Sequence, residues 1–279
     1  MFLRFRMEEK LQRSRLSLNQ ITTPRWSVVQ AIEACVRRKI PSIALWRHKI
    51  DEQGLNASVR AVRDAGMRVS SVCRGGMLPA VNAEERRKRI EDNFRAIDEA
   101  TALNADVLVM VVGGAWPMGI RSARKMVHEG IAELVPYAES AGVRLGLEPL
   151  HPMFAGDRSV LTTIPEALGI AQNYPAAHVG VILDVFHIWW DPCVMQEIQD
   201  AAGRIFGFHV SDWLVPLPDV LKGRGMLGDG VIDLRCLRET VDGAGYVGPI
   251  EVEILNQTLW DEDPDSVLDR LVQRFEQLV

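Results

Sequence analysis

The feature that most constrains the fold is an alternation of short apolar segments with longer amphipathic ones along nearly the whole chain. We expect eight strands, each followed by a helix, within 279 residues. That is about 35 residues per unit, which is typical of a closed (β/α)8 barrel. The expected strands cover 16–20, 42–46, 67–73, 106–112, 143–148, 178–184, 205–210 and 250–254. The sequence therefore predicts an α/β protein with a single TIM barrel domain over 15–279, preceded by an N-terminal extension over 1–14.

The expected helices share an apolar stripe or a capping signal. They cover about 26–38, 55–65, 83–103, 122–140, 165–172, 191–202, 234–244 and 264–279. In the helix over 191–202, Asp191 is expected to be the N-cap and Pro192 the first helical residue. A loop rich in proline and glycine is expected over 211–230. A doubly wound open sheet is the alternative, but the segment 16–24 contains no glycine for a phosphate-binding turn.

Composition limits the partners that the chain is expected to bind. The net charge of −5 argues against a nucleic-acid partner. The longest apolar run, near 105–112, is too short to span a membrane. The four cysteines show no paired spacing and are expected to be reduced, and the first fifteen residues are too densely charged for a signal peptide. We therefore expect a cytoplasmic protein with a small-molecule substrate and no membrane partner; a homo-oligomer remains open.

Four potential metal ligands follow one another on the last four expected strands. Glu148, Asp184, His209 and Glu253 stand at or near the carboxyl ends of these strands, where the active sites of such barrels lie. Because side chains alternate along a strand, these four are expected to point into the lumen. Gly146 and Gly207 are expected to leave room beneath them. The apolar alternates are expected to face the helices: Leu145, Leu147, Val181, Leu183, Phe206, Phe208, Val252 and Ile254.

This arrangement predicts a metal site. Three carboxylates close together disfavour one another's ionisation unless a cation compensates them. Three carboxylates and one imidazole suit a single divalent ion, with Mn, Mg, Co and Zn all open. The alternative is that each residue is an unrelated charge at a strand end. Four potential ligands that point to the same side on consecutive strands argue against this alternative.

Several motifs resemble the sugar phosphate isomerase/epimerase family of xylose isomerase-like TIM barrels. They are LEPLH at 147–151, LDVFH at 183–187, HVSD at 209–212, GDGVID at 228–233 and GPIEVEI at 248–254. The family includes ketose 3-epimerases, hydroxypyruvate isomerase, inosose isomerases and dehydratases, and endonuclease IV. The resemblance covers 16–279 and implies that the four residues bind a metal, that Glu148 and Glu253 transfer protons, and that His187 binds substrate.

The chain departs from the epimerase pattern at one position. The substrate-binding arginine expected shortly after His209 is missing, and Arg224 comes later, in a longer loop. The substrate therefore cannot be inferred from the resemblance. Further candidates for substrate binding are His151, Trp46, Arg74, Trp116, Trp189 and Arg224, while Asp212 and Asp229 are candidates to support the metal ligands.

The chemistry expected of the site is proton transfer next to a carbonyl. A metal that binds the carbonyl and adjacent hydroxyl of an α-hydroxyketone acidifies the intervening C–H and stabilises an enediolate. Two glutamates could then remove and return the proton. The sequence thus predicts a metal-dependent isomerase or epimerase of a ketose, inosose or related compound. The alternatives are an inosose-like dehydratase, an endonuclease IV-like nuclease, for which the third and fourth strands lack terminal histidines, and a non-catalytic sugar-binding barrel.

Overall fold

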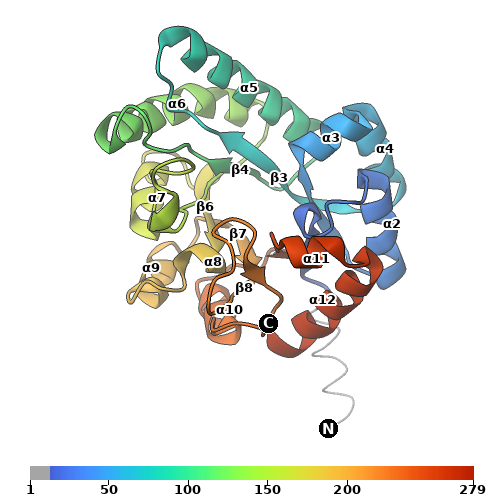
Figure 1. Cartoon of the computed structure of the whole chain (residues 1–279). Coiled ribbons are helices and arrows are strands. Elements are labelled where there is room, and N and C mark those ends of the chain that lie inside the picture. The colour runs from blue at the N-terminus through green and yellow to red at the C-terminus, as the bar shows by residue number, and fades with distance from the viewer. Residues whose placement is uncertain (1–12) are drawn as a thin grey trace.

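The computed structural model describes residues 13–279 and shows a closed barrel of parallel strands (Figure 1). The strands are β1 (Leu16–Asn19), β2 (Ser42–Trp46), β3 (Arg68–Gly76), β4 (Leu108–Val111), β5 (Leu145–Leu147), β6 (Val179–Asp184), β7 (Ile205–Val210) and β10 (Ile250–Val252). They neighbour one another in chain order, and β10 closes the ring against β1. The predicted TIM barrel is confirmed, whereas the extension over 1–14 lies, except for its last two residues, outside the described part of the chain.

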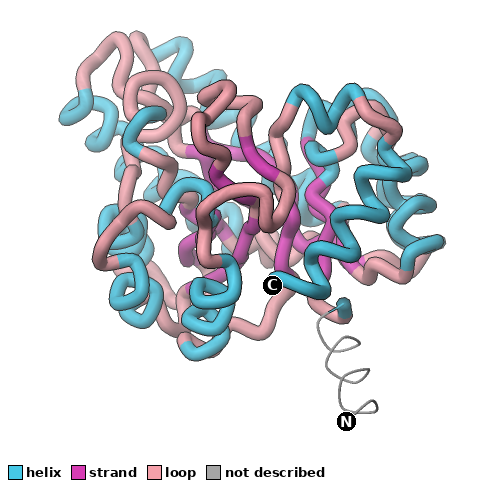
Figure 2. Tube along the Cα trace, turned by 60° about the horizontal axis from the view of Figure 1, so that its bottom comes forward, coloured by secondary structure: helices cyan, strands magenta, loops and turns pink. Residues whose placement is uncertain are grey.

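Helices surround the barrel on its outer side (Figure 2). One main helix follows each barrel strand: α2 (Val28–Arg38), α4 (Leu55–Asp64), α5 (Ala83–Ala102), α6 (Ile120–Ser140), α7 (Ile164–Ala171), α9 (Val194–Asp200), α10 (Leu234–Gly243) and α12 (Pro264–Leu278). The short ones are α3 (Arg47–Gln53), α8 (Val185–Ile188), α11 (Gln257–Asp261) and the 3-10 turns η1 (Gln20–Thr22) and η2 (Pro152–Phe154). Within 13–279, no helix combines the length and apolar character needed to cross a membrane.

Local capping interactions set where most helices begin. Ser27 and Gln30 form a reciprocal capping box at the start of α2, which satisfies backbone donors that the helix itself cannot pair. Asn82 caps α5 and Asp263 caps α12 in the same general way. The prediction for α9 was wrong: Asp191 accepts a hydrogen bond from the Cys193 amide in a turn, and the helix begins only at Val194.

The main core lies between the strands and the helices, and a smaller apolar cluster lies inside the barrel. The cluster inside the barrel contains Cys73, Val107, Val109, Ile182 and Phe206. Phe206 was expected to face the helices, but the β6–β7 pairing passes from Ile205 to Gly207 and skips it. This bulge places the Phe206 ring in the lumen, because an extra residue changes the alternation of side chains.

The two lumenal glycines make room for a neighbouring side chain. A Cβ atom at Gly146 would lie 2.5 Å from Ile182 Cδ1, and one at Gly207 would lie 2.8 Å from the same atom. The space that the sequence predicted beneath the site is therefore filled by Ile182. This residue gives the site an apolar floor.

The expected long loop over 211–230 contains regular structure of its own. Strands β8 (Asp212–Trp213) and β9 (Arg224–Gly225) pair antiparallel, with Asp212 opposite Gly225. This hairpin rises from the carboxyl end of β7 and brings Arg224 back toward the barrel axis.

Candidate functional site

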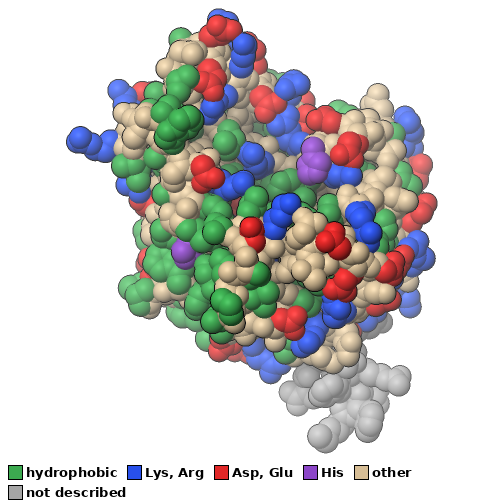
Figure 3. Space-filling view, viewed as in Figure 1, with side chains coloured by type: hydrophobic (Ala, Val, Ile, Leu, Met, Phe, Trp, Pro, Cys, Tyr) green, Lys and Arg blue, Asp and Glu red, His purple; other side chains and the backbone are tan. Residues whose placement is uncertain are grey.

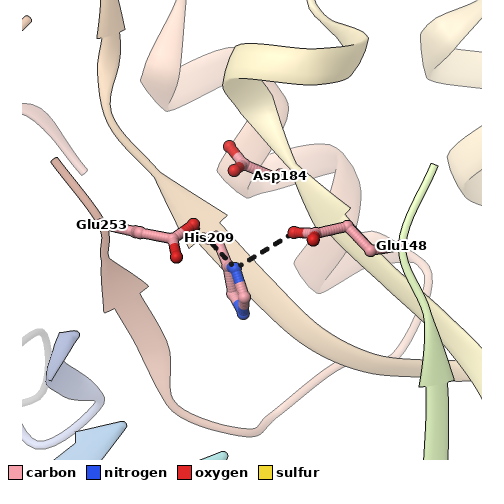
Figure 4. A group of neighbouring side chains, drawn as sticks. All are labelled: Glu148, Asp184, His209 and Glu253. Atoms are coloured by element: carbon pink, nitrogen blue, oxygen red, sulfur yellow. Dashed lines mark ion pairs between the residues drawn. The ribbon is translucent and has the colours of Figure 1, made fainter. Parts of the chain in front are cut away.

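Four acidic and imidazole side chains converge at the carboxyl end of the barrel. Potential ligand atoms of Glu148, Asp184, His209 and Glu253 all lie within 4.8 Å of one another, and all four residues are buried. Glu148 and Glu253 approach His209 from opposite sides (Figure 4). His209 Nδ1 is 3.6 Å from Glu148 Oε1 and 3.5 Å from Glu253 Oε2. Strands β5, β6, β7 and β10 thus bring together the residues that the sequence singled out.

The charges of these residues are strongly coupled. Burial and the charge of Glu253 raise the pKa of the Glu148 carboxyl to about 8. Burial alone would lower the pKa of His209. The neighbouring Glu251 and Glu253 carboxylates outweigh this effect and raise the pKa of His209 to about 10. The cluster therefore favours an additional positive charge, whether a proton or a metal ion.

Arg224 supplies one such positive charge from the β8–β9 hairpin. Its buried guanidinium donates through Nη1 to Asp184 Oδ2 at 2.7 Å and to Glu253 Oε2 at 3.2 Å. Burial alone would raise the pKa of Asp184, but the charge of Arg224, together with His187, His209 and the Phe186 amide, outweighs this effect and lowers the pKa. The guanidinium also lies over the Phe186 ring, 4.7 Å from its centroid, a favourable cation–π geometry. Arg224 is therefore a fixed counter-ion of two metal-ligand candidates.

The hairpin that carries Arg224 is held by buried polar groups. Asp212 accepts hydrogen bonds from the amides of Trp213, Gly228 and Ile232. Asn256 donates its side-chain amide to the Arg224 carbonyl at 2.7 Å. The Asp212 carboxylate thus organises the loop rather than contacting the cluster of ligands.

His187 lies beside the same guanidinium. Burial lowers its pKa to about 3, so the ring is neutral at physiological pH. Its Nε2 is 3.2 Å from Arg224 Nη2. Because that arginine nitrogen can only donate, Nε2 is the acceptor and the ring hydrogen is on Nδ1. His187 Nδ1 is buried and makes no hydrogen bond to the described residues, so this donor has no partner in 13–279.

A cavity of about 200 Å³ opens above the cluster. Its polar lining consists of Trp46, Arg74, Glu148, Arg158, His187, Arg224 and Glu253. Its apolar lining includes Ile21, Val111, Leu150, Phe154, Phe186, Leu221 and Leu255. This volume is smaller than the roughly 300–1,000 Å³ of pockets for drug-sized ligands, so the cavity suits a compact molecule.

Comparison with known proteins identifies the family. A family model described as a xylose isomerase-like TIM barrel matches residues 29–276. The chain belongs to this family. The match extends from α2 to near the end of α12 and includes all four ligand candidates.

Relatives of this xylose isomerase-like barrel include a sugar phosphate epimerase. L-ribulose-5-phosphate 3-epimerase UlaE of Escherichia coli K12 is 28% identical over 214 residues, which are 75% of this chain and 71% of that protein. The crystal structure of protein SMc04130 from Sinorhizobium meliloti 1021 is 42% identical, with a TM-score of 0.92, and the match covers 95% of this chain and 98% of that one. IOLI protein with a bound zinc atom shares the fold at 17% identity and a TM-score of 0.82, over 95% and 98% of the two chains.

The remaining predicted residues of this xylose isomerase-like barrel lie around or away from the cavity. His151 accepts a hydrogen bond from the Met153 amide and packs between the rings of Trp190 and Trp213. Trp189 also packs against Trp213. These residues do not line the cavity. Two exposed candidates do not line it either: Trp116 is 81% exposed, and Asp229 pairs with Arg274 at 3.2 Å.

Sequence reasoning missed three polar residues of the site. Glu251 Oε2 lies 3.2 Å from His209 Nε2, and the buried Asn19 donates to both Glu251 and Glu253 at 3.2 Å. Asn19 also accepts a hydrogen bond from Trp46 Nε1 at 2.8 Å. Strand alternation could have revealed Glu251, two residues before Glu253. The third, Arg158, follows no strand, so no sequence pattern pointed to it.

Proposed function

We propose that this protein is a divalent-metal-dependent isomerase or epimerase of a ketose, inosose or related α-hydroxyketone. The observation that carries the proposal is the buried cluster of three carboxylates and one imidazole at the carboxyl end of the barrel. Sugar epimerases occur among the relatives, which supports the same class of reaction. A compact cavity directly above the cluster offers space for the substrate.

The residues present fit a metal ion. His209 Nδ1 is buried without a hydrogen-bond partner in the described chain, although it faces two carboxylates. Oxygen and imidazole donors of this kind suit Mn, Mg, Co or Zn. When bound, such an ion acts as a Lewis acid that polarises a carbonyl and acidifies the neighbouring C–H.

Glu148 and Glu253 are the groups that we expect to move the proton. They directly follow β5 and β10 and lie on opposite sides of the site (Figure 4). One carboxylate can remove the proton from an α-carbon, and the other can return a proton to the opposite face or to the adjacent carbon. Arg224 and His187, which both line the cavity, can hold the substrate oxygens whose charge changes during this transfer.

A dehydratase of an inosose-like substrate would begin with the same proton removal. It would then expel a β-hydroxyl group, so the two reactions differ in product rather than in the first step. The expected absence of nucleic-acid binding, the cytoplasmic location and the oligomeric state stay predictions.

The test is to replace each glutamate by glutamine, which keeps an oxygen ligand but removes the base. Metal content is measured first, and turnover and deuterium uptake from D2O are then followed over a panel of ketoses and inososes. We expect Glu148→Gln and Glu253→Gln to lose about 10²- to 10⁴-fold in rate at equal metal occupancy. Glu133→Gln, on the exposed face of α6, is the matched control. Near wild-type rates in both variants would overturn the assignment of the base.

A further inference from the structure

We propose that Arg74 and Arg158 bind an anionic group, a carboxylate or a phosphate, on the part of the substrate remote from the metal cluster. This inference rests on the proposed function and adds a substrate class to it. The three arginines that line the cavity are the starting point, because only one of them has its charge balanced.

The balanced arginine is Arg224, which pairs with Asp184 and Glu253. The side chain of Arg74 makes no hydrogen bond or ion pair with any residue in 13–279. The only carboxylate among the described residues that Arg158 approaches is Asp157, at 3.8 Å and 70% exposed, and its guanidinium otherwise lies over the Phe154 ring, 5.9 Å from the centroid. Two positive charges at the cavity therefore lack an effective partner.

Their surroundings make this lack costly. Both arginines are half-buried, and the cavity wall around them is largely apolar, with Leu150 and Phe154 among its members. The acidic residues of the lining are Glu148 and Glu253, both of which belong to the metal cluster. A half-buried charge without a partner is unfavourable, and an anionic ligand would relieve that cost through charge-assisted hydrogen bonds.

The backbone holds both arginines firmly in place. The β3–β4 pairing passes from Cys73 to Gly75, so Arg74 occupies a bulge, a feature that redirects a side chain and recurs beside active sites. Arg158 belongs to the loop after β5, and its carbonyl accepts a hydrogen bond from the Gly113 amide at 2.8 Å. The loop passes so close that a Cβ at Gly114 would lie 2.4 Å from the Asp157 backbone. Neither arginine sits on a loosely held segment.

The two ends of the substrate would occupy different parts of the cavity. Figure 3 shows basic, acidic and hydrophobic side chains together near the centre of the view, although the protein as a whole carries a net charge of −5. The cluster would hold the ketone end of the substrate. The two arginines would then bind a negatively charged group on the same molecule.

The test compares neutral and anionic versions of the same probe. Deuterium uptake and kcat/KM are measured for a ketopentose and its 5-phosphate, a ketohexose and its 6-phosphate, and a ketohexonate with a terminal carboxylate. We expect an anionic probe to be preferred, and Arg74→Met and Arg158→Met each to lower its kcat/KM by about 10- to 100-fold, the usual range for a charged hydrogen bond. The same variants should lower kcat/KM for the neutral probe clearly less than for the anionic one. Comparing kcat/KM for the phosphorylated probes with kcat/KM for the ketohexonate shows which anion the site accepts.

Arg60→Met, an exposed arginine on α4, is the matched control. Equal kcat/KM for neutral and anionic probes, or equal losses for both in the arginine variants, would overturn the anion site while leaving the proposed function intact. If no probe exchanges deuterium, the proposed function fails, and binding of inorganic phosphate to the metal-free protein still decides the inference. Phosphate binding that is weakened by Arg74→Met but not by Arg60→Met would support it, and identical binding in all variants would refute it.

Discussion

The two halves of the barrel contribute opposite kinds of side chain to the site. The strands β1 to β4 contain no aspartate or glutamate. In contrast, β5, β6, β7 and β10 bear at or beside their ends all four metal-ligand candidates and Glu251. These four strands are consecutive neighbours in the ring, so their carboxylates form one continuous acidic arc.

The difference shows that the second half of the barrel provides the groups for binding a cation, whereas the first half helps to shape the cavity. A single ion can balance an arc of carboxylates on neighbouring strands, whereas charges spread around the whole ring would need several. The first half instead supplies Asn19, Trp46 and Arg74, which contact the arc or line the cavity. Three substitutions test this division, in order of expected effect.

Arg224 is the buried cation that pairs with two carboxylates of the acidic arc. Arg224→Met leaves Asp184 and Glu253 buried without their cation, and removing one member of a buried ion pair costs about 3–5 kcal/mol. We expect that loss in the free energy of unfolding in the presence of a chelator. The loss should be smaller with saturating Mn, because a divalent cation then balances the carboxylates. Urea unfolding under both conditions measures it.

Arg274→Met is the control for this experiment. Arg274 pairs with Asp229 at the surface, where an ion pair contributes at most about 1 kcal/mol. Equal destabilisation of the Arg224 variant with and without Mn would show that Arg224 contributes packing alone.

Glu251 is expected to orient the imidazole of the arc. It lies on the Nε2 side of His209, while Nδ1 faces Glu148 and Glu253. Partners of this kind fix the orientation of a metal-binding histidine, and losing one costs about 10- to 100-fold in metal affinity. Glu251→Gln should weaken Mn binding by that factor in a competition titration with a chelating dye. Glu239→Gln, exposed on α10, should bind Mn as the wild type does; an unchanged Glu251 variant would contradict the role.

Trp46 tests the first half of the barrel and should have the smallest effect. Trp46→Phe removes the hydrogen bond from Nε1 to Asn19, which contributes about 0.5–1.5 kcal/mol to stability, but leaves metal affinity unchanged. Trp260→Phe is the matched control, since Trp260 Nε1 is buried without a hydrogen-bond partner among the described residues. If Trp46→Phe lowered Mn affinity as much as Glu251→Gln does, the proposed division of roles between the two halves would be wrong.

The order and type of the main elements could be read from the sequence because each strand and helix carries its own periodicity. Apolar alternation located β6 and β7 to within a residue, and glycine or capping residues located most helix ends. The same alternation placed Glu148, Asp184, His209 and Glu253 in phase, and ring closure brought them together. Local pattern and barrel geometry agree at these positions.

The sequence by itself did not determine features that depend on contacts between distant segments. The bulge at Phe206 arises from the pairing of β6 with β7, so no alternation within β7 reveals it. The late start of α9 has a local cause instead: Asp191 accepts a hydrogen bond from the Cys193 amide in a short turn, and the helix begins only after it.

Tertiary structure also decided which arginines reach the site. Arg224 reaches Asp184 because Asp212 and Asn256 hold its hairpin, and Arg158 reaches the cavity because its loop pairs with Gly113. A long side chain on a loop has no periodicity of its own, so its position is set by the backbone hydrogen bonds of the segments that hold it. The sequence by itself thus determined the barrel and the residues of its acidic arc. The tertiary structure determined which arginine side chains lie beside that arc and its cavity.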